Sequence, residues 1–103
     1  MGDRLELHTI LTELISPYKV YFQPPSSIRL EYPCIIYELE DINTSYADSV
    51  KYTKIKVYTV TVIDQNPDSD IPNKLLNLDY CEFNRYFISD NLNHYVFTLF
   101  YKN

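Results

Sequence analysis

The sequence contains very little glycine: of its 103 residues, the only one is Gly2. Glycine-rich phosphate loops, the dinucleotide-binding fingerprint and the nucleophile elbow of hydrolases all need glycine within the chain, so these three motifs are excluded. Tryptophan is absent as well, and no apolar run approaches the roughly 20 residues that a membrane-spanning helix needs. The sequence therefore predicts neither an enzyme built on these motifs nor a contact with membrane.

Positive charge is also scarce, with nine Lys and Arg against 14 Asp and Glu and a formal net charge of −5. Proteins that grip nucleic acid need basic residues to neutralise phosphates, so a basic nucleic-acid surface is not expected. The two histidines, His8 and His94, have no further ligand at a metal-binding spacing. Asp64, Asp68 and Asp70 surround a turn but lack the glycine and the glutamate of a calcium loop. We expect a solvated acidic turn, no metal and no cofactor.

Two cysteines, Cys34 and Cys81, fall on separate predicted strands and are expected to be buried, reduced thiols. A catalytic pair of Cys81 with His94 is conceivable, but Asp79 and Glu82 flank Cys81, and negative charge disfavours a reactive thiolate. The sequence thus predicts no catalytic residue.

The chain is rich in aromatic residues, with 11 Tyr and 5 Phe, and 46% of it is hydrophobic. Tyrosine favours strands and partner surfaces, where the ring is buried and the hydroxyl stays hydrated. The length suits a single domain over residues 1–103.

Hydrophobic spacing predicts two helices and five strands. Apolar residues at helical spacing follow the cap-like pair Asp3 and Glu6, and Pro17 ends this first helix at Ser16. Ser69 or Asp70 can cap a second helix. The predicted strands cover residues 19–22, 34–39, 52–64, 83–89 and 95–101. The order α-β-β-β-α-β-β predicts an α+β fold, an antiparallel sheet with both helices packed on one face.

The strand over residues 52–64 has an unusual pattern. Its apolar phase moves from Ile55 and Val57 to Val60 and Val62, which predicts a bulge, a twist or two halves that bury opposite faces. Its 13 residues would extend about 43 Å, longer than the roughly 34 Å of a compact chain of this size. The strand must therefore curl strongly or project as a long hairpin, with residues 41–50 at its end.

The final strand, residues 95–101, is apolar or aromatic on both faces, so it should be central in the sheet or covered by a partner chain. Lys51, Lys54 and Lys56 alternate with Tyr52 and Tyr58. Two interpretations of this cluster stay open: exposed lysines that protect a strand edge, or an interface in which the lysines meet a neighbour's carboxylates.

Three runs of the sequence, in this order, resemble one family. They are residues 32–37 (YPCIIY) with 46–49 (YADS) and Tyr52, residues 58–64 (YTVTVID) with 68–72 (DSDIP), and residues 83–87 (FNRYF) with 90–94 (DNLNH). Together they resemble the tail terminator, or tail-to-head joining, proteins that complete the tails of long-tailed bacteriophages, and the resemblance covers residues 18–101.

The resemblance implies a structural role. Such proteins form a six-membered ring at the head-proximal end of the tail tube, end tube growth and join the tail to the head. The partners implied are further copies of the chain, the major tail tube protein and the head completion or connector proteins. DNA would pass through the ring without specific binding. The protein would be made in the host cytoplasm and reside in the virion.

For the subunit or partner interface we expect aromatic and basic residues of the long strand, its hairpin and the final strand: Tyr46, Tyr52, Lys54, Lys56, Tyr58, Tyr95 and Tyr101. Two alternatives remain. One is a head-completion or stopper protein of the phage neck, with residues 41–50 as a plugging loop. The other is an unrelated enzyme or ligand-binding module, which an enclosed cavity with converging polar groups would favour.

Overall fold

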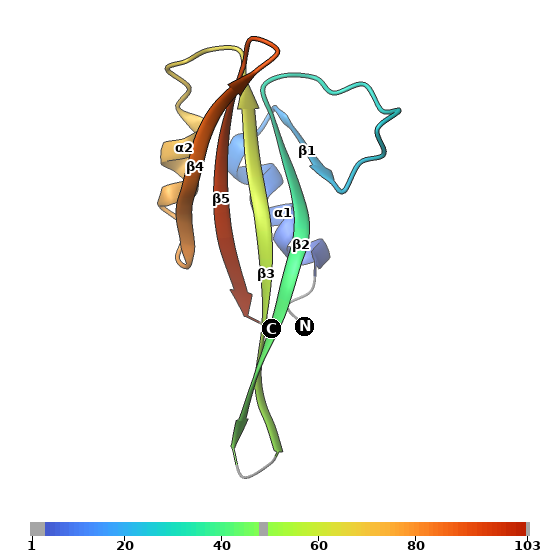
Figure 1. Cartoon of the computed structure of the whole chain (residues 1–103), viewed down its shortest axis with the longest axis vertical. Helices are drawn as coiled ribbons and strands as arrows, with labels where there is room; N and C mark the ends of the chain where they lie inside the picture. The colour runs from blue at the N-terminus through green and yellow to red at the C-terminus, as the bar shows by residue number, and fades with distance from the viewer. Residues whose placement is uncertain (1–3, 48–49, 103) are drawn as a thin grey trace.

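The computed structural model describes residues 4–47 and 50–102, and the side chains of residues 4–42 and 55–101 (Figure 1). The elements in chain order are α1 (Arg4–Ile15), β1 (Lys19–Phe22), β2 (Cys34–Ala47), β3 (Val50–Asp64), α2 (Ile71–Leu76), β4 (Cys81–Ser89) and β5 (Leu92–Lys102). The strands form one sheet in the order β1-β2-β3-β5-β4. The predicted α+β class and the predicted element order are confirmed.

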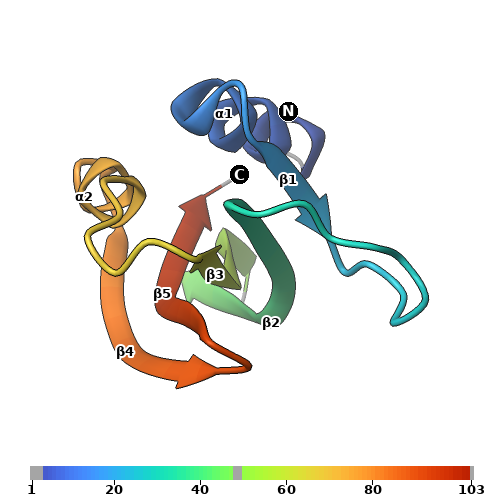
Figure 2. The same cartoon turned by 90° about the horizontal axis from the view of Figure 1, so that it is seen from above.

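Both helices cover the same face of the sheet, as predicted (Figure 2). One buried cluster joins the apolar sides of α1 and α2 to side chains of the three inner strands. Its members are Leu7, Leu11 and Ile15 from α1, Ile71 and Leu75 from α2, and Ile35, Tyr37, Tyr58, Val60, Val62, Phe97 and Leu99 from the sheet. We call this side of the sheet the helix face and the other side the open face.

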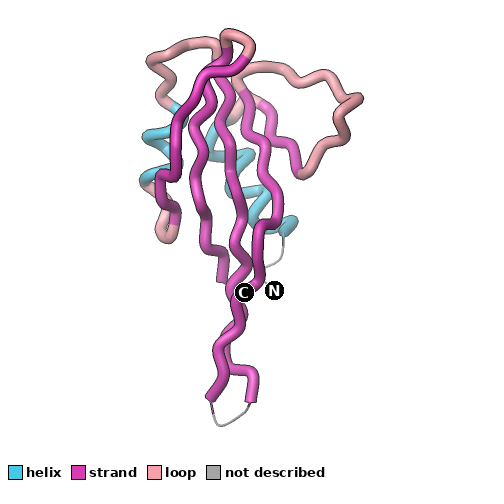
Figure 3. The backbone as a smooth tube through the Cα atoms, in the orientation of Figure 1, coloured by secondary structure: helices cyan, strands magenta, loops and turns pink. Residues whose placement is uncertain are grey.

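The sheet is mixed rather than wholly antiparallel. Strands β2, β3, β5 and β4 pair antiparallel in that order, whereas β1 lies parallel to β2, with Lys19 opposite Cys34 and Phe22 opposite Tyr37. Residues 23–33 return the chain to the end of the sheet at which β1 began (Figure 3). Such a return makes neighbouring strands parallel, because a direct hairpin cannot. The expectation of a wholly antiparallel sheet is therefore corrected at β1.

The apolar phase of β3 changes because the two halves of the strand bury side chains on different faces of the sheet. Tyr58, Val60 and Val62 point to the helix face, where the helices cover them. Val57 is also buried, although it lies on the open face opposite Phe100 of β5. The irregularity of pairing nearest to the phase change lies in the partner strand β2, between Leu39 and Asp41. A second one, between Ser45 and Tyr46 of β2, leaves out Tyr52 of β3. Strand β5 lies between β3 and β4, which confirms its predicted interior position.

Strands β2 and β3 continue beyond the rest of the sheet. Strand β5 ends where Lys102 lies opposite Ile55, and from there β2 and β3 pair with each other as far as Ala47 opposite Val50 (Figure 1). The molecule is 51 Å long and 25 Å by 23 Å across. Residues 48 and 49, which join the two strands, lie outside the described residues, so the projecting hairpin itself stays a prediction.

The helix ends agree with the sequence where the structure describes them. Helix α1 ends at Ile15, one residue before the predicted stop, while the predicted cap Asp3 lies outside the described residues. At α2, Asp70 occupies the N-cap position without a side-chain hydrogen bond. Instead, the backbone N–H of Ile71 donates to the hydroxyl of Ser69 at 3.4 Å.

His8 is half-buried on α1 and belongs to a hydrogen-bonded group. The Tyr37 hydroxyl lies 2.8 Å from His8 Nδ1, and Arg4 donates to the same hydroxyl at 3.4 Å. The Arg4 guanidinium also lies 4.4 Å from the centre of the Phe22 ring. Since Arg4 supplies the hydroxyl with a donor, Tyr37 can give its own proton to a neutral His8. These contacts fasten the start of α1 to β1 and β2.

Replacing Tyr58 should test whether its ring belongs to the core. Tyr58 is 2% exposed and contacts the Tyr37 ring edge-on, with 5.8 Å between ring centres. We expect Tyr58→Ala to lower the free energy of unfolding by about 3–5 kcal/mol in urea denaturation, as other buried aromatic truncations do. Leu39→Ala, at the exposed position opposite on β2, should change it by about 0.5 kcal/mol. A stable Tyr58→Ala monomer would contradict this assignment.

Acid should weaken the fold through His8. Burial, and secondly the charge of Arg4, lower the pKa of His8 below its ordinary value of 6.5. The unfolded chain therefore takes up this proton more readily than the folded one, and stability present above pH 6.5 is lost as the pH falls below it. Urea denaturation from about pH 8 to about pH 5 should show this loss in the native chain and a smaller one in His8→Gln. The control Thr9→Gln, at an exposed position of α1, should retain the native slope; equal slopes in all three proteins would refute the role of His8.

Candidate functional site

Strand β4 forms an edge of the sheet and exposes large hydrophobic side chains. Every residue of β4 after Cys81 is exposed. The β4 edge surface, as we call it, consists of Tyr80, Phe83, Tyr86, Phe87 and Ile88, and Tyr80 and Ile88 are 73% and 64% exposed. Proteins normally shorten or charge such an edge, because its unpaired backbone groups can pair with another chain. A long aromatic edge strand is therefore typical of a surface that another protein covers.

The rings of this surface are held in place by β5. Three cross-strand pairs form: Phe83 with Phe97 at 5.5 Å between ring centres, Tyr86 with Tyr95 at 5.0 Å, and Phe87 with His94 at 4.6 Å. The last pair is stacked, with 12° between the ring planes, and the guanidinium of Arg85 lies 5.4 Å from the Phe87 ring centre. Such pairs favour one arrangement of the rings. The surface is thus ordered before any partner binds.

A hydrogen-bonded group fixes the β4–β5 hairpin to the end of β3. The Tyr86 hydroxyl donates to the side-chain oxygen of Asn93 at 2.5 Å. The Asn93 amide in turn donates to the backbone carbonyls of Asp64 at 3.1 Å and Gln65 at 3.5 Å. Asn93 is buried, so its polar groups need these partners. The hairpin carrying the edge surface therefore cannot move independently of β3.

The charges along β4 are arranged unevenly. Asp79 and Glu82 lie at its beginning, Arg85 lies near its middle and Asp90 follows its end. The pairing with β5 is interrupted between Phe83 and Arg85, so β4 consists of two short segments. Both ends of the edge are acidic.

Of the interface residues predicted from the sequence, Tyr58 must be removed. Its ring is buried in the core, because the second half of β3 turns that position toward the helices. The prediction failed because alternation of Lys and Tyr was taken to continue through Tyr58, whereas the buried phase changes there. Tyr46, Tyr52 and Lys54 lie where side chains are outside the described ones, so they stay predictions.

The remaining predicted residues do not form one patch with the β4 edge surface. Tyr95 is half-buried, packs against Tyr86 and donates its hydroxyl to the carbonyl of Pro67 at 2.9 Å, and burial above all raises its pKa. Tyr101 is half-buried and donates to a carboxylate oxygen of Glu6. Lys56 lies opposite Tyr101 on β3. The structure thus brings Lys56 and Tyr101 together and places Tyr95 some distance along β5.

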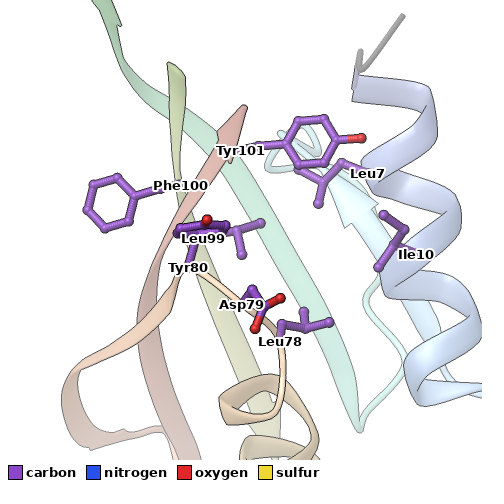
Figure 4. A pocket seen from close by; sticks show the side chains of 8 residues that line it. All are labelled: Leu7, Ile10, Leu78, Asp79, Tyr80, Leu99, Phe100 and Tyr101. Carbon is purple, nitrogen blue, oxygen red and sulfur yellow. The ribbon is translucent and has the colours of Figure 1, made fainter. Parts of the chain in front are cut away.

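Two hollows bear on the enzyme alternative. One of about 220 Å³ lies between α1 and β5 and is lined by Leu7, Ile10, Leu78, Asp79, Tyr80, Leu99, Phe100 and Tyr101. Figure 4 shows Leu99 and Tyr101 pointing toward α1, while Phe100 points to the other side of β5. Its lining is almost wholly apolar and does not bring polar groups together around a substrate.

The second hollow, of about 400 Å³, lies at the acidic turn and is lined in part by Asp64, Asp68 and Asp70. The turn closes on itself, since the backbone N–H of Asn66 donates to the Asp64 side chain and that of Asp68 to the Asn66 side chain. Among the described residues, no group of three or more His, Cys, Asp and Glu could hold a metal ion. The described helices include none with the length and apolarity to cross a membrane.

The two cysteines form no disulfide, and their environments disfavour the reactive thiolate form. Burial raises the pKa of Cys34 to about 12 and that of Cys81 to about 11, with the charges of Asp64 and Glu82 adding to the respective effects. Cys81 lies opposite Leu99, whereas His94 lies opposite Phe87. The two side chains are thus five positions apart along β5 and on opposite faces. The Cys81–His94 pair does not form.

Comparison with known proteins adds no assignment: no family model matches the chain, and no curated protein matches it either.

The β4 edge surface was not predicted from the sequence. Residues 83–89 were predicted as a strand, but their place at the edge of the sheet depends on pairing between distant segments. One signal was present: alternation places Phe83 and Phe87 on one face of the strand and Tyr86 and Ile88 on the other, so neither face is wholly polar. A strand of this kind must lie inside a sheet or against a partner.

The thiols should react slowly with iodoacetamide in the folded protein. At about pH 8, a thiol of pKa about 11 is roughly one-thousandth thiolate, about a hundredth of the fraction in an exposed cysteine. We expect labelling of Cys81, followed by mass spectrometry, to be about 100-fold slower than after unfolding in urea. Rapid labelling of folded Cys81 would contradict this and favour a reactive thiol.

Proposed function

We propose that this protein is a structural subunit that assembles into a ring at the head-proximal end of a bacteriophage tail tube, ends tube growth and joins the tail to the head. The observation that carries the proposal is the β4 edge surface, an ordered aromatic strand that pairs with β5 on one side and has no strand on its other side within the described chain. Its large exposed side chains indicate that another protein chain covers it.

A ring of identical copies fits an open sheet with two unlike edges. Strand β4 has nine residues, whereas β1 at the other edge has four. Contacts between two different patches of identical subunits produce closed rings or open filaments. The number six, and the position between tube and head, come from the resemblance to tail terminators in the three runs of sequence described above.

The charge of the chain fits the proposed setting. With a formal net charge of −5, the subunit would repel rather than bind DNA that passes through the ring. The proposed partners are the major tail tube protein on one side and the head completion or connector proteins on the other. The subunit itself needs no cofactor in this role.

The stopper alternative depended on a plugging loop at residues 41–50. In the structure, residues 41–47 belong to β2 and pair with β3 from Asp41 opposite Val57 to Ala47 opposite Val50. A paired strand is a poorer candidate for a movable plug than an unpaired loop. The terminator is therefore the function we favour, and binding to purified tail tubes rather than to the portal would distinguish it.

Substitution of the edge surface should weaken ring assembly and reduce tube capping. We expect Ile88→Asp to weaken ring assembly by about 2 kcal/mol per interface, roughly 30-fold, because a carboxylate would be buried among aromatic rings. The matched control is Leu5→Asp, since Leu5 and Ile88 are both 64% exposed but Leu5 lies on α1. Electron microscopy of purified tubes mixed with each variant measures the fraction of tubes that carry a ring.

The two variants must first show the same circular dichroism spectrum and free energy of unfolding. Equal capping by both variants would contradict the assignment of β4. Particles made without the protein test the function itself: headless tails of uncontrolled length support it, and normal tails joined to heads refute it.

A further inference from the structure

We infer that the outer edge of β4 in one copy pairs with the outer edge of β1 in the next, so that the sheet continues from subunit to subunit around the ring. This inference rests on the proposed ring and adds which two edges meet. It is carried by four features of the structure: two free edges, their directions, the faces of their side chains and their charges.

The two edges lie at opposite sides of the sheet, as Figure 2 shows. Each edge strand pairs with one neighbour within the described chain, β4 with β5 and β1 with β2. Exposed apolar side chains also flank β1, namely Tyr18, Ile28 and Tyr32. Both edges therefore offer free backbone groups together with apolar contact area.

The strand directions allow the pairing. Strand β4 is antiparallel to β5, β5 to β3 and β3 to β2, whereas β1 is parallel to β2. Strands β4 and β1 consequently run in opposite directions. Rotation about an axis along the strands preserves these directions, so β4 and the β1 of the next copy would meet as an antiparallel pair.

Matching of faces limits the register. Opposed residues in a sheet point to the same side. On β4, Tyr86 and Ile88 share the helix face with their partners on β5, and on β1, Val20 and Phe22 share it with Ile35 and Tyr37 of β2. Registers that oppose Val20 or Phe22 to a residue of the open face are thereby excluded, and the allowed registers differ by steps of two residues.

The interruption after Phe83 leaves Arg85–Ser89 as the longer regular segment of β4, which is long enough for all four residues of β1. One allowed register aligns the two segments fully. It sets Lys19 opposite Ser89, Val20 opposite Ile88, Tyr21 opposite Phe87 and Phe22 opposite Tyr86. Apolar side chains then meet at three successive positions.

Charge favours the same register. Lys19 would lie beside Asp90, which follows β4 directly. In this subunit Lys19 contacts Glu31 at 3.8 Å, but both side chains are more than half exposed, and a pair so exposed adds little stability. Pairing of β4 with a second β4 is disfavoured, because an antiparallel pair would set Glu82 of one copy near Asp90 of the other.

Disulfide crosslinking tests this register. Directly opposed residues of antiparallel strands have Cα atoms about 4.5–5.5 Å apart, within the range that a disulfide spans. We expect the double variant Val20→Cys, Ile88→Cys, oxidised after mixing with tail tubes, to lose its monomer band on non-reducing gels and to give a ladder ending at the closed ring. The matched control is Val20→Cys with Tyr86→Cys, whose cysteines would be offset by about 7 Å along the strands and therefore too far apart for a disulfide.

The outcomes separate the inference from the proposed function. A ladder from the first pair and none from the control supports the inference, whether or not the tubes are capped. Capped tubes without a ladder overturn the inference and leave the proposed function standing. A crosslinked dimer from Ile88→Cys alone overturns it in favour of a symmetric β4 pair. A chain that stays monomeric at high concentration and with tubes overturns it as well.

Discussion

The fold depends on how little of the sheet the two helices can cover. Helix α1 has 12 residues and α2 has six, and their buried side chains reach β2, β3 and β5. The large rings of Tyr37, Tyr58 and Phe97 fill the space beneath them. Strand β4 contacts α2 and packs Cys81 against the core, but every residue of β4 after Cys81 is exposed, so its aromatic side chains remain at the surface. The exposed edge follows from a core that uses only the first residue of this strand.

Tyrosine serves two purposes in this chain. At the core, the Tyr37 hydroxyl forms hydrogen bonds with Arg4 and His8, so the ring is buried without leaving its hydroxyl unbonded. At the edge, Tyr86 turns its hydroxyl inward to Asn93 and leaves ring surface exposed. The composition alone could not separate these purposes, because both satisfy a preference for a buried ring and a bonded hydroxyl.

Local patterns were enough to predict the helices, the strands, their order and the interior place of β5. Each of these depends on the spacing of apolar residues or on a proline, both of which act over a few neighbouring positions. The parallel pairing of β1 and the edge position of β4 depend on contacts between distant segments, which no local pattern specifies. Tyr58 was misplaced because its burial depends on how far the helices extend over β3, which the sequence of the strand does not specify.

The hydrogen bonds on both sides of strand β3 determine how the molecule would respond to a pull along that strand. From Ile55 to Asp64 it is bonded on one side to β5 and over most of that length on the other to β2, and its end is held by the amide of Asn93. A pull along the strand would load these bonds together, in shear, instead of opening them one after another. Tension entering at the outer end of β2 and β3 would therefore pass through the sheet to the loop before α2 without first separating the strands.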